Sequence, residues 1–245
     1  MHHRSAFDRM MTVVVGTKEF QMYRGLLCFH SEYFKKLLDG PFKEGGSNKH
    51  RLADVTPDTF TMFYNWIHTS TVTDLREQSD AELEYDDLVN LHAFADFHMV
   101  QQLKNRSLEL YFMCLASKWV APLWCTSFMY EETTEKSRLR ALHVDILAET
   151  SAFDNWRTDA KQFPKDFIAD IFDIFRKQKT VPGSAFALRN GGTADWINSK
   201  RDSFCEKYHN ITSLSNAQRY MSRVFPTLHY NTDLYQQFQL QTQSR

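Results

Sequence analysis

The chain has 245 residues, 42% of them apolar and 14% aromatic, which is enough to bury the core of a large domain or of a domain with an extension. Its 29 basic and 30 acidic residues leave a formal net charge of -1, without the basic excess that nucleic-acid or anionic-membrane binding favours. The longest apolar runs, such as residues 110–115, are far shorter than the roughly 20 residues of a membrane span. The first 11 residues lack the apolar stretch of a signal peptide. We therefore expect no nucleic-acid or membrane partner, and a place in the cytoplasm, the nucleus or both.

Four cysteines are present, and no two of them have CxxC spacing; they are Cys28, Cys114, Cys125 and Cys205. Each has apolar or aromatic neighbours in the sequence. This pattern favours buried free thiols in a reducing compartment over a disulfide framework.

The first elements follow from local pattern. Residues 11–23 combine the β-branched run TVVV, a GTK turn and an alternating EFQMY, which predicts a hairpin. The next stretch, 25–40, predicts two short helices broken near His30, with Ser31 capping the second and Gly40 ending it. Residues 50–55, HRLADV, predict a short strand.

The central region predicts three helices. Thr56 at an N-cap and Pro57 at the first helical position begin one, whose apolar face carries Phe60, Phe63, Tyr64 and Ile67. Residues 73–84 are polar and acidic and predict a solvated loop. Two helices are then expected near 85–97 and 100–118.

The sequence after Pro122 stays helical. Ser137 precedes one amphipathic helix, and Pro164 begins another in which Phe167, Ile171 and Phe175 recur at i, i+4 and i+8. Residues 181–192 predict a linker, 194–209 a last helix, and the residues from 211 a polar tail. We therefore divide the chain into 8–118, a helical extension 119–209 and a loose tail 210–245.

Three motifs in register resemble the BTB/POZ family. The first, over 13–44, matches the family's V-x-G turn, its basic residue, its leucine pair and its serine with paired aromatics, at Gly16, Phe20, Arg24, Leu26, Leu27, Ser31, Tyr33 and Phe34. The second, over 50–70, is similar to the family's strand, helix and closing Y-T-G. The third, over 88–105, matches its helix pair at Leu91, Ala95, Asp96, Leu103 and Asn105. The resemblance covers about 11–118 and implies an α+β fold, a small β-sheet flanked by a helical cluster, followed here by the mostly helical extension.

A fourth stretch, 129–148, resembles the segment that follows this domain in the filamentous-fungal branch of the family. The matching positions are Tyr130, Glu131, Thr133, Ser137, Leu139, Arg140, Leu142, Val144 and Asp145. We therefore expect the chain to be most like that branch.

The sequence departs from the family pattern at several positions. Tyr23 replaces a histidine, and Ser70 replaces the final glycine of Y-T-G. Met10 replaces the acid that, in many relatives, pairs with the residue matched by Arg24 in a charged pocket at the dimer groove, so half of that pocket is missing. Only about ten residues precede the first strand, which leaves no room for the N-terminal helix and strand that many BTB homodimers exchange. Self-association is possible, but a swapped homodimer is not expected.

The resemblance also assigns a candidate partner site. BTB adaptors of cullin-type ubiquitin ligases carry an apolar-x-Glu motif in the loop where this chain has GPFKEGG, residues 40–46. It implies that Phe42 enters a pocket of the cullin scaffold and that Glu44 supports the contact. The alternative is that Phe42 folds back onto its own domain and Glu44 is solvated.

Other candidate sites are weak. His92, His98 and Asp96 could be imagined as a metal site, but Asp96 fills the family's structural A-D position, which favours capping or hydrogen bonding. Trp119 and Trp124 are expected to pack between the domain and the extension. No hydrolase, phosphate-loop, dinucleotide or zinc-protease motif occurs. We expect no catalytic, cofactor or metal site, and a non-catalytic interaction module: a cullin adaptor or, alternatively, a self-associating or heterotypic scaffold, for example in transcriptional regulation.

Overall fold

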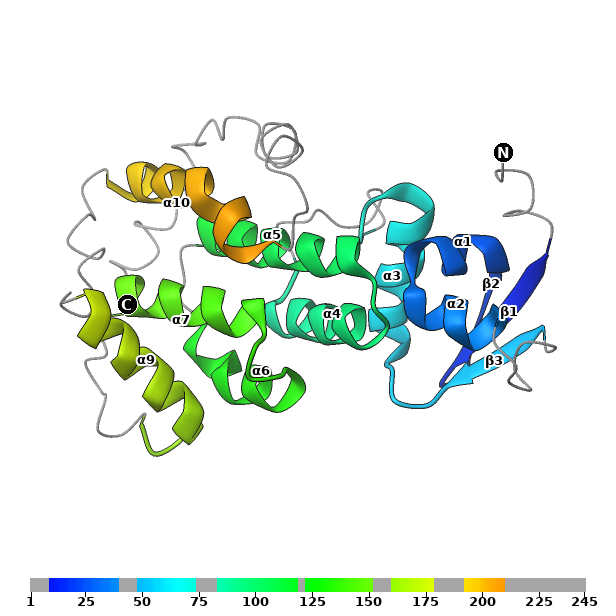
Figure 1. The fold of residues 1–245 in the computed structure, drawn as a ribbon, viewed down its shortest axis with the longest axis horizontal. Helices are drawn as coiled ribbons and strands as arrows, with labels where there is room; N and C mark the ends of the chain where they lie inside the picture. The colour runs from blue at the N-terminus through cyan, green and yellow to red at the C-terminus, as the bar shows by residue number, and fades with distance from the viewer. Residues whose placement is uncertain are drawn as a thin grey trace, which may run out of the picture.

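The computed structural model describes residues 9–39, 48–73, 83–118, 122–151, 160–178 and 192–209. The strands are β1 (Met10–Val15), β2 (Lys18–Tyr23) and β3 (Lys49–Leu52). The helices are α1 (Arg24–His30), α2 (Glu32–Asp39), α3 (Pro57–Thr69), α4 (Tyr85–Phe97), α5 (Gln101–Lys118), the 3-10 turn η4 (Leu123–Cys125), α6 (Thr126–Glu132), α7 (Arg138–Thr150), α9 (Lys165–Gln178) and α10 (Gly192–Tyr208). Figure 1 shows the sheet with α1–α3 at one end, the α4–α5 pair in the middle and the later helices at the other end. This confirms the α+β class with a mostly helical second half.

The sheet has the order β2-β1-β3. The predicted hairpin is confirmed, since β1 and β2 pair antiparallel around a turn at Gly16, whose φ of 58° is left-handed. A Cβ built on Gly16 would lie 3.3 Å from Cγ of Pro57, so the turn also packs closely on the start of α3. The strand predicted over 50–55 is shorter and ends at Leu52, because β3 runs parallel to β1 and its partner strand ends at Val15.

Two predicted helix caps are confirmed in atomic detail. Ser31 separates α1 from α2, and its hydroxyl accepts a hydrogen bond from the Phe34 N–H at 3.0 Å. The Thr56 hydroxyl accepts from the Thr59 N–H at 3.2 Å at the start of α3. These side chains satisfy backbone donors that a helix leaves unpaired at its N-terminus.

Most of the core forms one large cluster of buried side chains. This cluster runs from β1 through α3, α4 and α5 to α7 and α10. The ends of the polar stretch 73–84 join it: Thr73 and Leu83 are buried, and the Leu83 carbonyl accepts hydrogen bonds from Cys114 and Lys118. The prediction of a solvated loop was wrong for these two residues, since an apolar Leu83 just before α4 is pulled into the core; residues 74–82 lie outside the described ranges. The division at residue 118 stays a prediction.

Side chains within residues 129–148 connect α6 to α7. Arg140 is buried and donates to the Tyr130 carbonyl at 2.6 Å, to the Thr133 carbonyl and to the Thr133 hydroxyl, so it caps the C-terminal end of α6. Its guanidinium also lies over the Tyr130 ring at 4.3 Å. Ser137 caps α7, with its hydroxyl accepting from the Leu139 N–H at 3.2 Å. These motif positions hold α6 and α7 together.

α7 is buried on nearly every side. The predicted stripe of Leu139, Leu142, Ile146 and Leu147 is in the core, and the helix also buries Arg140, His143 and Asp145. α9 packs on it through Phe167 and Ile171 in a second, smaller core cluster, while Phe175 is only half-buried. The sequence pattern found the apolar stripe and missed the polar residues that α7 buries opposite it.

The aromatic and thiol predictions had mixed outcomes. Cys114, Cys125 and Cys205 are buried free thiols, whereas Cys28 is half-buried and also free. Trp124 is 59% exposed, although its ring lies 5.9 Å from that of Tyr85, so the expectation of a packed interdomain tryptophan was wrong there. Trp119 lies outside the described residues. Within those residues, no helix combines the length and apolar character needed to cross a bilayer.

Candidate protein-interaction site

The predicted partner-binding residues Phe42 and Glu44 lie in residues 40–47, outside the described part of the chain. The structure places the two elements that this segment connects. It begins after the last residue of α2, Asp39, and the description resumes at residue 48, just before β3. The environment of α2 is therefore what the structure adds to this site.

The C-terminal end of α2 is held by Arg24. Its guanidinium donates to the Leu38 carbonyl and forms an ion pair with Asp39 at 3.0 Å. A cation at this position satisfies a terminal carbonyl of α2 and favours the negative end of the helix dipole. Position 10 is a methionine and offers no counter-charge, and Arg24 pairs with Asp39.

An exposed apolar surface lies beside the other end of α2. Phe97, the last residue of α4, is 68% exposed, and Met99, between α4 and α5, is 52% exposed. The Tyr33 ring of α2 lies 5.7 Å from the Phe97 ring, and Leu37 follows one turn later on the same side of α2. We call these four residues, Tyr33, Leu37, Phe97 and Met99, the α4–α5 turn surface.

Met99 has an unusual backbone. Its φ is 53°, in the left-handed region that glycine prefers. The Val100 N–H donates to Ala95 at 2.8 Å and the Met99 N–H to Asp96 at 3.2 Å, the bond pair of a Schellman motif. A methionine there costs about 1 kcal/mol relative to glycine. The left-handed backbone of Met99 is therefore unfavourable although its side chain lies largely in solvent, and such strained positions cluster at functional sites.

The turn beneath this surface is firmly supported. His98 is buried and its ring stacks on Phe94 with centroids 4.1 Å apart. Burial lowers the pKa of His98 to about 4, so the ring is neutral at pH 7. The Ser31 hydroxyl donates to the His98 carbonyl at 2.6 Å and ties the turn to the start of α2. Phe97 and Met99 therefore project from a fixed backbone.

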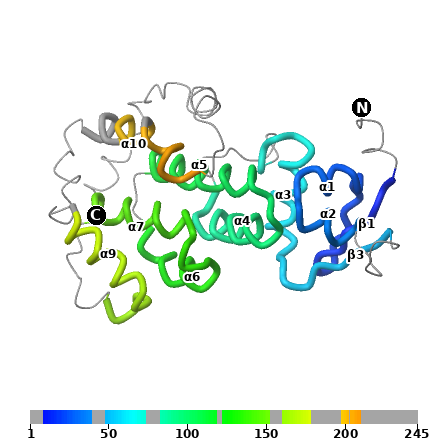
Figure 2. The backbone as a smooth tube through the Cα atoms, in the orientation of Figure 1, coloured from blue at the N-terminus to red at the C-terminus, as the bar shows by residue number. Residues whose placement is uncertain are grey.

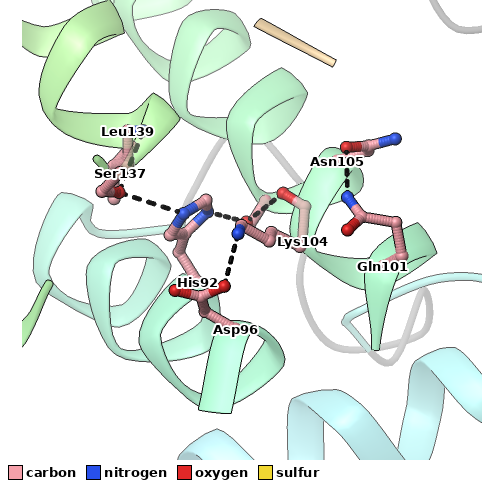
Figure 3. A network of polar contacts seen from close by, with 8 residues as sticks. His92, Asp96, Gln101, Lys104, Asn105, Ser137 and Leu139 are labelled. Atoms are coloured by element: carbon pink, nitrogen blue, oxygen red, sulfur yellow. Dashed lines mark hydrogen bonds and ion pairs between the residues drawn. The ribbon is translucent and has the colours of Figure 1, made fainter. Parts of the chain in front are cut away.

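The imagined metal site is a hydrogen-bonded structural network, shown in Figure 3. His92 Nδ1 lies 2.9 Å from the Ser107 hydroxyl and Nε2 lies 3.4 Å from the Ser137 hydroxyl, while Asp96 forms an ion pair with Lys104. Burial lowers the pKa of His92 to about 3. Among the described residues, no three histidine, cysteine or carboxylate side chains are grouped as metal ligands. The expectation that Asp96 bonds rather than ligates a metal agrees with this geometry.

Phe97 and Met99 were missed by sequence reasoning. Helical periodicity places apolar residues of α4 in the core, and it does not separate Phe94 inside from Phe97 outside at a helix end. One signal was available: Ala95 and Asp96 precede two large apolar residues that flank His98 without a glycine to end the helix.

The first half of the described chain is a small α+β domain. It combines a three-stranded sheet built on a β-hairpin, two short helices separated by Ser31, and the helix pair α4–α5. The BTB/POZ family model matches residues 7–105. The chain is also 29% identical over 99 residues to human Kelch-like protein 30, 26% over 140 residues to human Kelch-like protein 23, and 30% over 87 residues to mouse BTB/POZ domain-containing protein 9. These alignments cover 40%, 48% and 35% of this chain.

The same alignments cover 16%, 24% and 14% of the three relatives, so the chain spans less than a quarter of their length. The family match over residues 7–105, the fold of this part and the positions of its motifs all indicate the same domain. The chain contains a BTB/POZ domain.

Proposed function

We propose that this protein is a non-catalytic adaptor that docks a cullin-type ubiquitin-ligase scaffold, with Phe42 and Glu44 as the loop contacts and the α4–α5 turn surface as their support. The observation that carries the proposal is the exposure of Phe97 and Met99 on a fixed turn beside α2, the helix that leads into residues 40–47. The FKE motif points to the same partner class through the family resemblance.

The chemistry of the α4–α5 turn surface suits a protein partner. Interfaces are dominated by a few large side chains that enter pockets, and aromatic residues and methionine are enriched among them. Because the Met99 backbone and the His98 carbonyl are already held in place, ordering this surface on binding costs little entropy. A single phenylalanine in a loop would be a weak anchor, and the α4–α5 turn surface offers the partner a second apolar contact.

The test is binding of the purified full chain to a cullin N-terminal domain, measured by calorimetry. We expect a Kd of tens of micromolar or tighter, with Phe42→Ala, Glu44→Lys and Phe97→Ser each weakening it at least about tenfold. Phe172→Ser is a matched control, because Phe172 on α9 has the same 68% exposure as Phe97 and lies in the helical extension. Absence of binding at tens of micromolar, or equal losses in the control, would sink the adaptor role.

A self-associating scaffold is the second candidate. It is favoured by Phe29 on α1, which is 72% exposed and so offers an apolar contact on a different helix. Light scattering on the full chain distinguishes the two: a stable oligomer that Phe29→Ser dissociates, with no cullin affinity, supports the scaffold. A monomer with cullin affinity supports the adaptor.

Three narrower statements belong to the same proposal. They are a closest likeness to the filamentous-fungal branch, residence in the cytoplasm or nucleus, and a division into residues 8–118, 119–209 and 210–245 in which the extension recruits a second protein. The first rests on the sequence positions matched over 129–148 alone.

A further inference from the structure

Figures 1 and 2 show α10 beside α5, and its side chains contact both α5 and α7. We call the surface of α5 and α7 that faces α10 the α5–α7 groove. α10 runs antiparallel to both helices, since Phe204 and His209 meet α5 at Phe112 and Glu109, while Lys200 and Tyr208 meet α7 at Glu149 and Asp145. Residues 179–191, which connect it to α9, lie outside the described ranges.

The floor of the groove is apolar and binds α10 through few side chains. Among the described side chains of α10, four are buried, namely Ile197, Phe204, Cys205 and Tyr208. The Phe204 ring packs on Phe112 with centroids 5.2 Å apart. The 18-residue helix α5, in contrast, buries ten of its side chains. α10 is therefore expected to open more easily than α5, because local stability follows buried apolar contact.

The rim of the groove is acidic, and α10 supplies its counter-charges. Lys200 pairs with Glu149 at 2.6 Å, and Lys207 pairs with Asp145 at 2.7 Å. The Tyr208 hydroxyl also donates to Asp145 at 2.5 Å.

Two further contacts lie at the C-terminal end of α10. His209 Nε2 lies 3.2 Å from Oε1 of the fully buried Glu109, whose other oxygen pairs with Arg106. Arg138 donates to the Lys207 carbonyl at 2.9 Å and so binds the C-terminal end of α10. Across the groove, the acids belong to α5 and α7 and the bases facing them to α10.

This arrangement has the form of a helix-in-groove complex within one chain. Anchors at Ile197, Phe204 and Tyr208 recur at i, i+7 and i+11, with Lys200 and Lys207 two turns apart. A small cavity remains between the two sides, lined by Phe112, Leu142, Ile146 and Phe204 among others, so the fit is not fully packed.

We propose that α10 is a releasable, built-in ligand of the α5–α7 groove, which opens as a unit and can be replaced by a basic amphipathic helix of a partner protein with the same anchor and lysine spacing. Because α10 is tethered, its effective concentration is high, and a partner helix competes only when α10 opens. This proposal does not rest on cullin docking, which uses α2 and the α4–α5 turn surface.

The first experiment is native-state hydrogen exchange on the full wild-type chain. Amides of residues 197–208 are expected to exchange at least about tenfold faster than those of residues 108–115 in α5, and to exchange together. Equal, slow exchange of both segments would mean that α10 leaves only when the whole molecule unfolds, which overturns the proposal.

The second experiment uses a labelled peptide with the sequence of residues 192–209 and fluorescence anisotropy. In the full chain, Lys200→Glu places an acid against Glu149, loosens α10 and leaves the groove intact. The peptide is expected to bind this variant at least about tenfold more tightly than wild type or the control Lys165→Glu, whose lysine is exposed on α9. A peptide carrying Lys200→Glu and Lys207→Glu should not bind.

Equal peptide affinity for the three chains, or tighter binding of the doubly acidic peptide, overturns the proposal. Should Lys200→Glu unfold the protein, the exchange measurement on the wild type still decides it.

Discussion

Ser70 ends α3 with a φ of 64°, and its N–H donates to the Trp66 carbonyl at 2.8 Å. The Y-T-G pattern that this stretch resembles has glycine here, and glycine adopts the left-handed region without the steric penalty of a Cβ. We predict that Ser70→Gly raises the free energy of unfolding by about 0.5–1 kcal/mol, measured by urea denaturation. Ser70→Ala keeps the Cβ and should bring no gain; equal effects of the two variants would contradict the backbone explanation.

Met99 allows stability and binding to be separated at one residue. Met99→Gly removes the left-handed penalty and loses a side chain that is half in solvent, so we predict a rise in Tm of about 2–4 °C for each kcal/mol gained. The same variant should weaken cullin binding at least about threefold, because the apolar contact is gone. A variant that is both less stable and equally good at binding would show that Met99 serves packing instead.

Arg140 shows how one buried side chain joins elements. It supplies hydrogen bonds to two carbonyls at the end of α6 from within α7. We predict that Arg140→Lys destabilises the protein by about 2–4 kcal/mol in urea denaturation. The lysine ammonium is a compact group that cannot reach both carbonyls as the wider guanidinium does, so one buried carbonyl is left unpaired. Arg176→Lys on α9, at an exposed ion pair with Asp173, should change stability by less than about 0.5 kcal/mol. Similar losses for both would argue against the capping role.

Helix starts were predictable from the sequence where a side chain bonds a backbone N–H two or three residues further along the chain. Ser31, Thr56 and Ser137 each cap the helix that follows, and the residues needed for this are local. β3 was placed too far along the chain, because its end is set by the length of β1, which is a tertiary fact.

The candidate site was less accessible to sequence reasoning. Phe42 and Glu44 were predicted from the family resemblance of the FKE motif alone. The exposure of Phe97 could not be predicted, because it depends on how α2 packs against the end of α4. The acidic groove under α10 could not be predicted either, since Glu109, Asp145 and Glu149 come from two helices far from α10 in sequence and resemble ordinary helix-surface charges.

For the whole molecule, buried neutral histidines link stability to pH. Burial lowers the pKa of His92 and His143 to about 3 and of His98 and His209 to about 4. Their pKa in the unfolded chain is about 6.5, so below that pH the unfolded state binds more protons and folding stability falls until the folded pKa is reached. Well above pH 6.5 these histidines are neutral in both states and no longer lower the free energy of unfolding.

We predict that the free energy of unfolding falls between pH 6.5 and 5.5, with each of these histidines contributing up to about 1.4 kcal/mol per pH unit. Urea denaturation at pH 7.5, 6.5 and 5.5 measures it, and NMR should find that the His92 and His143 rings do not titrate in the folded protein over this range. Stability that stays constant or increases on acidification would contradict the buried, neutral assignment.

The central proposal is that this chain, which contains a BTB/POZ domain, binds a cullin-type scaffold through Phe42, Glu44 and the α4–α5 turn surface. Calorimetric titration of a cullin N-terminal domain into the wild type, Phe97→Ser and Phe172→Ser tests it most directly. The account predicts wild-type binding at tens of micromolar or tighter, at least about a tenfold loss for Phe97→Ser and no change for Phe172→Ser. No binding by the wild type, or equal binding by all three, would contradict it.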